Sequence, residues 1–290
     1  MEQILSRDSI AGNRSFSLSV LKEDLSSLYP GFFRYTLSVS DGIRTRAVFR
    51  TNTYEYAPGV PLHAEEVALQ KAGEWERELQ DDPDGFLSRN KPEPKRKTGY
   101  SHTDVVIVQG SPRPDGNCSI LAVWAAEAVR SIGRTVQVMY PHDLDIHACI
   151  GCYQCYNTGT CTFDDDMGNI IDAIRHASLI IICSPVYTNS VPGDLKLLID
   201  RCQAYHAELT ITGQTVNGKQ GLILSVAGRK GRTHFICITS VVKAFMRNVG
   251  INPAGELLID GVDEVRDIGN NKNLKEDVRT LVERAFTLNN

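Results

Sequence analysis

The chain has 290 residues, of which 42% are hydrophobic and 23% charged, and its formal net charge is −4. This composition is typical of a globular protein with a substantial core, and the length suggests about two domains. The mild acidity argues against a nucleic-acid partner or an anionic membrane surface. The N-terminus lacks the pattern of a signal peptide, and no apolar run approaches the roughly 18 residues that span a bilayer. We therefore expect a cytoplasmic protein with no membrane partner.

The first hundred residues predict a small α+β domain. The segment Phe32–Arg50 has the pattern of a β-hairpin with a three-residue loop at Ser40–Gly42. A helical pattern follows over residues 62–80, and its apolar positions could cover the hairpin. The predicted cross-strand pairs are Val39 with Ile43, Tyr35 with Ala47 and Phe33 with Phe49, which leaves Arg34, Arg44, Arg46 and Arg50 on the other face. We interpret this arginine face as solvated, with an anion or partner surface as the alternative.

A linker is predicted at Asn90–His102, where two prolines and a basic run interrupt the helical and strand patterns. It divides the chain into domains 1–98 and 99–290. The second domain alternates strand patterns with helical patterns. The strand patterns cover residues 104–109, 135–140, 178–187, 220–228 and 251–259, and the helical patterns cover 117–133, 165–177, 193–206, 233–250 and 273–288. This alternation predicts a doubly wound α/β fold, with a parallel sheet covered by helices on both faces.

Ligands of such sheets bind beyond the carboxyl ends of the strands, so the loops that follow the strands should carry the function. The first loop, Gly110–Ser119, leads into a helix whose N-terminus favours an anion. Ser111, Asn117 and Ser119 could add hydrogen-bond donors, and Arg113 could add a charge. The loop lacks the dinucleotide and triphosphatase fingerprints and suits a single phosphate monoester. The alternative is a turn with an ordinary Asn cap.

Two further loops have features of a ring-binding site. The loop Cys183–Asp194 presents Ser184, Tyr187 and Asn189, which could border a planar heterocycle, although Tyr187 could equally be a packing residue. The loop Ser225–His234 has two glycines and three basic residues that could approach a ring or a dinucleotide phosphate. A solvated surface loop explains that composition equally well.

Together, the segments from about Asp104 onward resemble the flavodoxin-like NAD(P)H-dependent FMN reductases, with their GSPR..GN and SPVY loops. The resemblance implies a flavodoxin-like five-stranded parallel sheet and bound FMN. It implies that the phosphate contacts Ser111, Arg113, Asn117, Cys118 and Ser119, and that the flavin is bordered by Ser184, Pro185, Val186, Tyr187, Asn189, Ala227 and Gly228. The sequence departs from the family at Cys118, where Thr or Ser is usual. A thiol is a weaker donor than a hydroxyl, so we expect reduced FMN affinity.

Four of the eight cysteines lie in one pattern, C-x2-C-x2-C-x5-C, at Cys149, Cys152, Cys155 and Cys161. Clustered cysteines in a reducing compartment more often bind metal or carry out redox chemistry than form structural disulfides. The pattern resembles the compact cysteine motif of archaeal and bacterial iron-sulfur flavoproteins. That resemblance implies a [4Fe–4S] cluster held by these four residues, homo-oligomers (a dimer or tetramer), and electron exchange between cluster and flavin.

Three other interpretations of the cysteines remain open: a zinc site, redox-active disulfides, and an inherited remnant without a cofactor. We expect Cys183, Cys202 and Cys237 to be core residues. We expect Asp164, Asp165 and Asp166 to cap the helix that follows them.

The predicted function is that of an FMN-dependent oxidoreductase whose [4Fe–4S] cluster relays single electrons. NAD(P)H, ferredoxin or a quinone would be its electron donor or acceptor. No catalytic side chain is required, because flavin N5 takes the hydride while the protein supplies orientation and electrostatics. The alternatives are a cluster-free NAD(P)H-dependent FMN or quinone reductase, and a non-catalytic zinc- or flavin-binding regulatory module.

Overall fold

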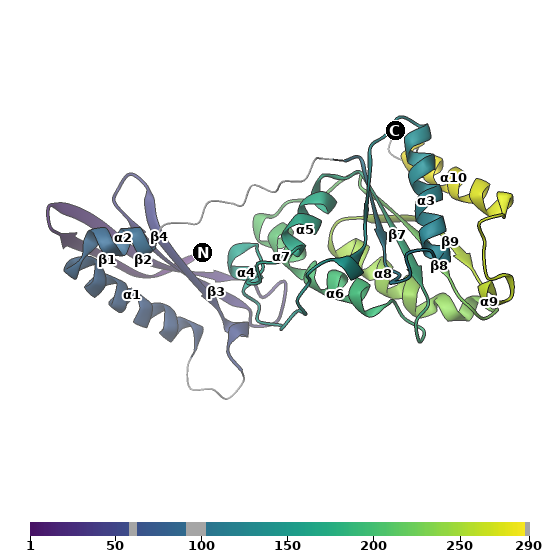
Figure 1. The fold of residues 1–290 in the computed structure, drawn as a ribbon. Helices are drawn as coiled ribbons and strands as arrows, with labels where there is room; N and C mark the ends of the chain where they lie inside the picture. Colours follow the sequence, from purple (N-terminus) through teal and green to yellow (C-terminus); the bar gives the residue numbers. More distant parts are fainter. Residues whose placement is uncertain (58–62, 91–102, 288–290) are drawn as a thin grey trace. The chain divides into compact units, whose positions relative to one another are not determined.

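The computed structural model describes residues 1–57, 63–90 and 103–287 (Figure 1). The chain divides into two compact units. The first unit contains Met1–Lys97 and Ile150–Thr162, and the second contains Thr98–Cys149 and Phe163–Asn290. The predicted linker lies almost wholly outside the described residues, so the boundary near residue 98 stays a prediction.

The first unit is built on an antiparallel sheet in the order β1-β2-β3-β4. Its strands are β1 (Glu2–Ala11), β2 (Arg14–Asp24), β3 (Phe33–Ser40) and β4 (Thr45–Asn52), and the 3-10 helix η1 (Thr53–Glu55) follows β4. The helices α1 (Ala64–Asp81) and α2 (Pro83–Arg89) cover one face of the sheet, as predicted for the helical pattern. Strand residues alternate between the faces, so the apolar ones form a core with the helices: Leu18, Val20, Leu37, Val39, Ala68, Trp75 and Leu79.

The predicted hairpin register is wrong. Val39 pairs with Ala47 and Leu37 pairs with Phe49, and the exposed fraction of Ile43 is 90%. The loop is longer than predicted because the Asp41 carboxylate accepts hydrogen bonds from the backbone N–H groups of Ile43 (3.1 Å) and Arg44 (2.9 Å). The observed shift is an even number of residues, so the apolar face still points toward the core.

The second unit confirms the predicted doubly wound α/β fold. Its parallel sheet has the order β6-β5-β7-β8-β9. The strands are β5 (Val105–Gln109), β6 (Val136–Met139), β7 (Leu179–Pro185), β8 (Gln220–Val226) and β9 (Asn252–Ile259). β5 and β7 are buried along almost their whole length, as strands covered on both faces must be.

Helices cover both faces of this sheet (Figure 1). α3 (Asn117–Ser131) and α10 (Lys272–Thr287) pack on one face. The other face is covered by α5 (Met167–His176), α6 (Gly193–Arg201), α7 (Gln203–Thr212) and α8 (Ile236–Asn248). The pattern over residues 193–206 therefore forms two helices, which meet at Cys202. The shorter elements are η2 (Pro141–Asp143), η3 (Arg232–Phe235) and α9 (Val262–Val265), and α4 (Cys155–Thr158) belongs to the first unit.

The strand order creates a switch point between β5 and β7. The chain leaves β5 toward β6 on one side and continues from β7 toward β8 and β9 on the other. The loops that follow β5 and β7 diverge at this point, which is where open parallel sheets bind their ligands.

Cys183 and Cys202 are buried in the core, which confirms their prediction. The prediction for Cys237 is wrong. Cys237 is exposed in the first turn of α8, which buries Ile238 and Val242 instead. In the described part of the chain, we find no helix that is both long enough and apolar enough to cross a membrane.

Candidate functional site

The loop after β5 is held tightly against the neighbouring elements. The N–H of Gly110 donates to the carbonyl of Cys183 at 2.8 Å. A Cβ atom at Gly110 would lie 2.6 Å from Cδ2 of Leu195 on α6, a separation that real Cβ atoms essentially never show. Glycine is therefore required where the chain leaves the sheet.

Gln109, which is not among the predicted site residues, organises this loop from within. Its Oε1 accepts from the N–H of Ser111 at 2.6 Å, and its Nε2 donates to Oγ of Ser119 at 2.7 Å. The Ser119 hydroxyl in turn donates to the carbonyl of Arg113 at 3.2 Å. Gln109 is only 1% exposed, and a polar residue that ends an otherwise apolar strand was the available signal. These bonds fix the loop and engage the hydroxyl of Ser119.

The N-terminus of α3 has the features of an anion site. Its N-cap residue is Gly116, which makes no side-chain cap, and the first N–H groups of a helix have no intrahelical partner. The helix dipole adds partial positive charge at the same end. Arg113 is exposed, and its guanidinium forms no ion pair with any carboxylate of the described residues. A phosphate group would find both backbone donors and a positive charge here.

Two predicted phosphate contacts have other side-chain partners. Oδ1 of Asn117 accepts from the N–H of Ile268 at 3.2 Å, and its Nδ2 donates to the carbonyl of Arg266 at 3.2 Å. Cys118 is 2% exposed and packs in the core, where burial raises the pKa of its thiol to about 12. Their backbone N–H groups, rather than their side chains, are what these residues could offer to an anion.

The loop after β7 forms a strained two-residue turn. Tyr187 and Ser190 exchange backbone hydrogen bonds at 2.9 Å, and the residues between them have left-handed backbones, with φ of 47° at Thr188 and 60° at Asn189. A left-handed β-branched residue is unfavourable, and such strain concentrates at functional sites. The turn leaves Tyr187 39% exposed.

The remaining predicted residues of this loop are less exposed. Ser184 is fully buried, and its hydroxyl donates to the carbonyl of Pro185 at 3.1 Å. The hydroxyl of Ser225 on β8 donates to the carbonyl of Ser184 at 2.7 Å. Pro185 and Val186 are half-buried. These contacts lock the base of the turn to the neighbouring strand.

The loop after β8 packs closely on α9. Ala227 is buried and its N–H donates to the carbonyl of Ile259 at 2.9 Å. A Cβ atom at Gly228 would meet the carboxylate of Asp263 on α9, so the backbone here lies close to that side chain. β5, β7 and β8 are parallel neighbours, so all three loops emerge at the same edge of the sheet.

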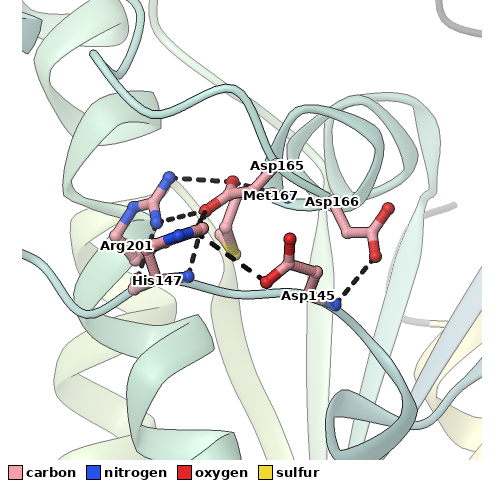
Figure 2. Close-up of polar contacts among 6 residues, drawn as sticks. All are labelled: Asp145, His147, Asp165, Asp166, Met167 and Arg201. Atoms are coloured by element: carbon pink, nitrogen blue, oxygen red, sulfur yellow. Dashed lines mark hydrogen bonds and ion pairs between the residues drawn. The ribbon is translucent and has the colours of Figure 1, made fainter.

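A buried ion-pair cluster joins the chain near His147 and the chain near Asp165 to Arg201 of α6 (Figure 2). Arg201 donates to both carboxylate oxygens of Asp165, at 2.6 and 2.9 Å, and to the carbonyl of His147 at 2.6 Å. The guanidinium also lies 5.0 Å from the centroid of the Phe163 ring, on which the imidazole of His147 stacks. This cluster joins α6 to two sections of chain that are 18 residues apart.

The capping prediction for the aspartates is correct only in part. Asp165 accepts from the N–H of Met167 at 3.2 Å, but its main partner is Arg201. Asp166 occupies the N-cap position of α5 without a side-chain cap. Its carboxylate instead accepts from the N–H of Asp145 at 2.9 Å.

The four predicted metal ligands are not gathered. Cys149 is exposed, while Cys152, Cys155 and Cys161 are half-buried. Throughout the described ranges, no three His, Cys, Asp or Glu side chains come together as a metal-binding group. We call Ile150–Thr162, which carries the last three of these cysteines, the cysteine segment.

A parallel sheet of this order, covered by helices on both faces, defines a flavodoxin-like fold. Residues 103–254, just over half of the chain, match the model of the NADPH-dependent FMN reductase family. The chain belongs to this family.

The curated relatives are iron-sulfur flavoproteins. One from Methanocaldococcus jannaschii is 35% identical over 127 residues, which cover 44% of this chain and 64% of the relative. One from Archaeoglobus fulgidus is 30% identical over 159 residues, which cover 54% of this chain and 68% of the relative. The chain thus spans just under two thirds of the first of these relatives. Among solved structures, RosB with a bound flavin intermediate is similar at 14% identity and a TM-score of 0.49, over 64% of this chain and 78% of that one.

Proposed function

We propose that this protein is an FMN-dependent oxidoreductase. The observation that carries the proposal is the loop after β5, which brings exposed Arg113 and the uncapped N-terminus of α3 to the switch point of the sheet. This arrangement offers one phosphate cradle and no dinucleotide fingerprint, which supports FMN rather than FAD.

The residues of the three loops would contact different parts of FMN. Arg113, Ser111 and the first N–H groups of α3 would hold the phosphate, with Ser119 fixing the loop. Pro185, Val186, Tyr187, Asn189, Ala227 and Gly228 would border the ring, above buried Ser184. Bound FMN supplies hydride and single-electron chemistry, and the protein would contribute orientation and exclusion of water. No side-chain acid or base is assigned.

Cofactor analysis tests this proposal. The cofactor released from the purified protein should be FMN by mass, and the apoprotein should bind FMN more tightly than riboflavin, which lacks the phosphate. Stoichiometric FAD, or equal affinity for FMN and riboflavin, would contradict the phosphate site. Stopped-flow reduction of the bound flavin by NADH and by NADPH then tests a nicotinamide as electron donor.

We further infer that Cys149, Cys152, Cys155 and Cys161 hold a [4Fe–4S] cluster. The donor set supports this in number and type, because four thiolates are what such clusters take. The similarity to iron-sulfur flavoproteins points the same way. In the conformation described above the thiols do not converge, so binding would require the segment to rearrange. A bound cluster would exchange single electrons, which suits ferredoxin as a partner.

The second candidate is a cluster-free NAD(P)H-dependent FMN or quinone reductase, which the ungathered thiols of the described residues favour. Anaerobic purification followed by iron, zinc, sulfide and thiol assays separates the possibilities. A cluster predicts about four iron and four sulfide per chain, whereas zinc predicts one metal and no sulfide. Iron below about one per chain after anaerobic reconstitution would end the cluster assignment. A homo-oligomer and a cytoplasmic location complete the proposal, and size-exclusion chromatography and cell fractionation test them.

A further inference from the structure

In the cysteine segment, residues that lie between the cysteines contact the rest of the first unit. Tyr156 and Asn157 are 1% and 2% exposed, while Cys152, Cys155 and Cys161 are only half-buried. The segment lies within the FMN reductase family match, yet its contacts place it in the unit formed by the N-terminal sheet. The buried residues between the cysteines therefore anchor the segment on that sheet.

Glu55 is the centre of the polar part of this anchor. From the sheet side, it accepts from the backbone N–H of Asn52 at 3.0 Å and from Thr51 Oγ1 at 3.1 Å. From the cysteine segment, it accepts from Gln154 Nε2 at 2.9 Å and from Asn157 Nδ2. One carboxylate thus joins residues about a hundred positions apart in the sequence.

Asn52 and Asn157 complete this network. Both side chains are almost fully buried, and Asn52 Nδ2 donates to Asn157 Oδ1 at 2.9 Å. The Asn157 amide also donates to the carbonyl of Arg50 at 3.4 Å. Buried amides without such partners are destabilising, so the network specifies one seating of the segment.

An aromatic cluster forms the other half of the anchor. The Tyr156 ring meets the rings of Tyr29 and Phe32 edge to face, with centroids 5.7 and 5.4 Å apart, and its hydroxyl lies 3.0 Å from that of Tyr29. The Tyr153 ring lies 5.1 Å from that of Tyr54. Tyr153 has a left-handed backbone, with φ of 57°, between Cys152 and Cys155. These contacts hold an unfavourable backbone at the centre of the C-x2-C pair.

Arg34 fixes the same short helix through its backbone. Its Nη1 donates to the carbonyl of Tyr156 at 2.9 Å, while its Nε donates to Glu23 at 2.7 Å. Arg34 is 8% exposed, so the prediction that it belongs to a solvated arginine face is wrong. A buried arginine thus holds α4, the turn that begins at Cys155.

We propose that the N-terminal sheet is a platform that positions the cysteine segment, with Asn52, Glu55 and Asn157 as its positioning residues. The residues between the cysteines seat the segment on the platform and leave Cys152 and Cys155 half-buried there. A role of these cysteines as ligands rests on the proposed cluster, whereas the position of the segment on the sheet does not. The platform gives the N-terminal domain a role in the redox chemistry of the chain.

The test compares Asn157→Leu with the wild type in the full-length protein. Leu keeps the branched shape of Asn in a larger side chain, and it removes the bonds to Asn52, Glu55, Gln154 and Arg50. We expect alkylation of Cys152 and Cys155 by iodoacetamide, measured by peptide mass spectrometry, to become about tenfold faster, equivalent to about 1.4 kcal/mol in local opening. Hydrogen exchange over residues 150–162 should accelerate with it, while the amount of bound FMN stays constant.

Two further variants make the result specific. Leu79→Ala opens a cavity in the core between α1 and the sheet, away from the segment, and should leave both thiol rates within about twofold. Gln154→Ala removes one bond to Glu55 and one from Asn157 but keeps the buried amide of Asn157, and it carries the test if Asn157→Leu does not fold. Unchanged thiol and exchange rates in the anchor variants, or equal acceleration in Leu79→Ala, would overturn the platform. Absence of iron from the wild type would instead reject the cluster, because alkylation and exchange report the seating without it.

Discussion

Arg201 and Asp165 form a bidentate ion pair whose side chains are 1% and 0% exposed. The pair joins α6 to the chain just after the cysteine segment, and the same guanidinium binds the carbonyl of His147 just before it. The two sections that flank the segment in the sequence are therefore fixed to one helix of the FMN reductase fold.

Asp165→Asn should destabilise the second unit by about 3–5 kcal/mol, because it leaves the buried charge of Arg201 uncompensated. Burial raises the pKa of Asp165, but the hydrogen bonds and charge of Arg201 outweigh it and hold the pKa below its usual value. The carboxylate therefore contributes stability above its unfolded pKa, which is lost as the pH falls through the folded pKa. In urea unfolding, the free energy of unfolding of Asp165→Asn should lie below that of the wild type, and this difference should become smaller toward low pH. The exposed Asp143→Asn is the matched control, and a loss below 1 kcal/mol for Asp165→Asn would contradict the stabilising role.

Arg113→Ala should weaken FMN binding by about 1.5–3 kcal/mol, the usual contribution of a hydrogen bond to a charged group. Riboflavin lacks the phosphate, so its affinity should not change. Titration of the apoprotein with each flavin, followed by quenching of flavin fluorescence, measures both effects. Arg130→Ala, at the other end of α3, keeps the loop intact and should bind FMN like the wild type. Equal losses of affinity for FMN and riboflavin would show that Arg113 does not contact the phosphate.

Asn189 has two separable roles, one in the turn after β7 and one in the proposed ring contact. Asn189→Gly keeps the left-handed backbone at φ 60°, whereas Asn189→Ala does not, so only the Ala variant should lose about 1 kcal/mol of stability. If the Asn189 side chain borders the flavin, both variants should weaken FMN binding. Thermal unfolding of the apoprotein and flavin titration measure the two roles. Wild-type affinity in Asn189→Gly would limit the residue to the turn.

The second unit was largely predictable because its strands are apolar runs buried on both faces, as in β5 and β7. The positions of the candidate loops then followed from the strand order. The first unit was harder. β1 is mostly exposed and polar, so its sequence lacks the alternation that identifies a half-buried strand. The hairpin register depended on two hydrogen bonds of Asp41, which residue patterns do not contain.

Contacts between residues far apart in the sequence could not be predicted. Arg201 fits the polar end of an amphipathic helix pattern, and only the folded structure pairs it with Asp165. Glu55, Asn52 and Asn157 have no local signature, because each is defined by partners about a hundred residues away. Sequence patterns identified the cysteines, but they gave no indication that the N-terminal sheet anchors them.

Glu55→Gln should reveal the cost of the buried carboxylate in the anchor. Burial raises the pKa of Glu55 and outweighs the hydrogen bonds from Asn157, Thr51, Asn52 and Gln154, which lower it. A raised folded pKa means that Glu55 contributes most below its unfolded pKa, and that this contribution is lost as the pH rises through the folded pKa. Gln does not ionise in this range, and rotation of the neighbouring amides and of the Thr51 hydroxyl lets it keep most partners. The stability of Glu55→Gln relative to the wild type should therefore increase between about pH 4 and pH 7, as measured by urea unfolding at each pH.

Glu74 on α1 provides a control of opposite sign, because the hydrogen bond and charge of Lys71 lower its pKa. Glu74→Gln should therefore lose stability relative to the wild type as the pH rises. A pH-independent difference for Glu55→Gln would show that the carboxylate is no harder to ionise in the folded protein than in the unfolded chain.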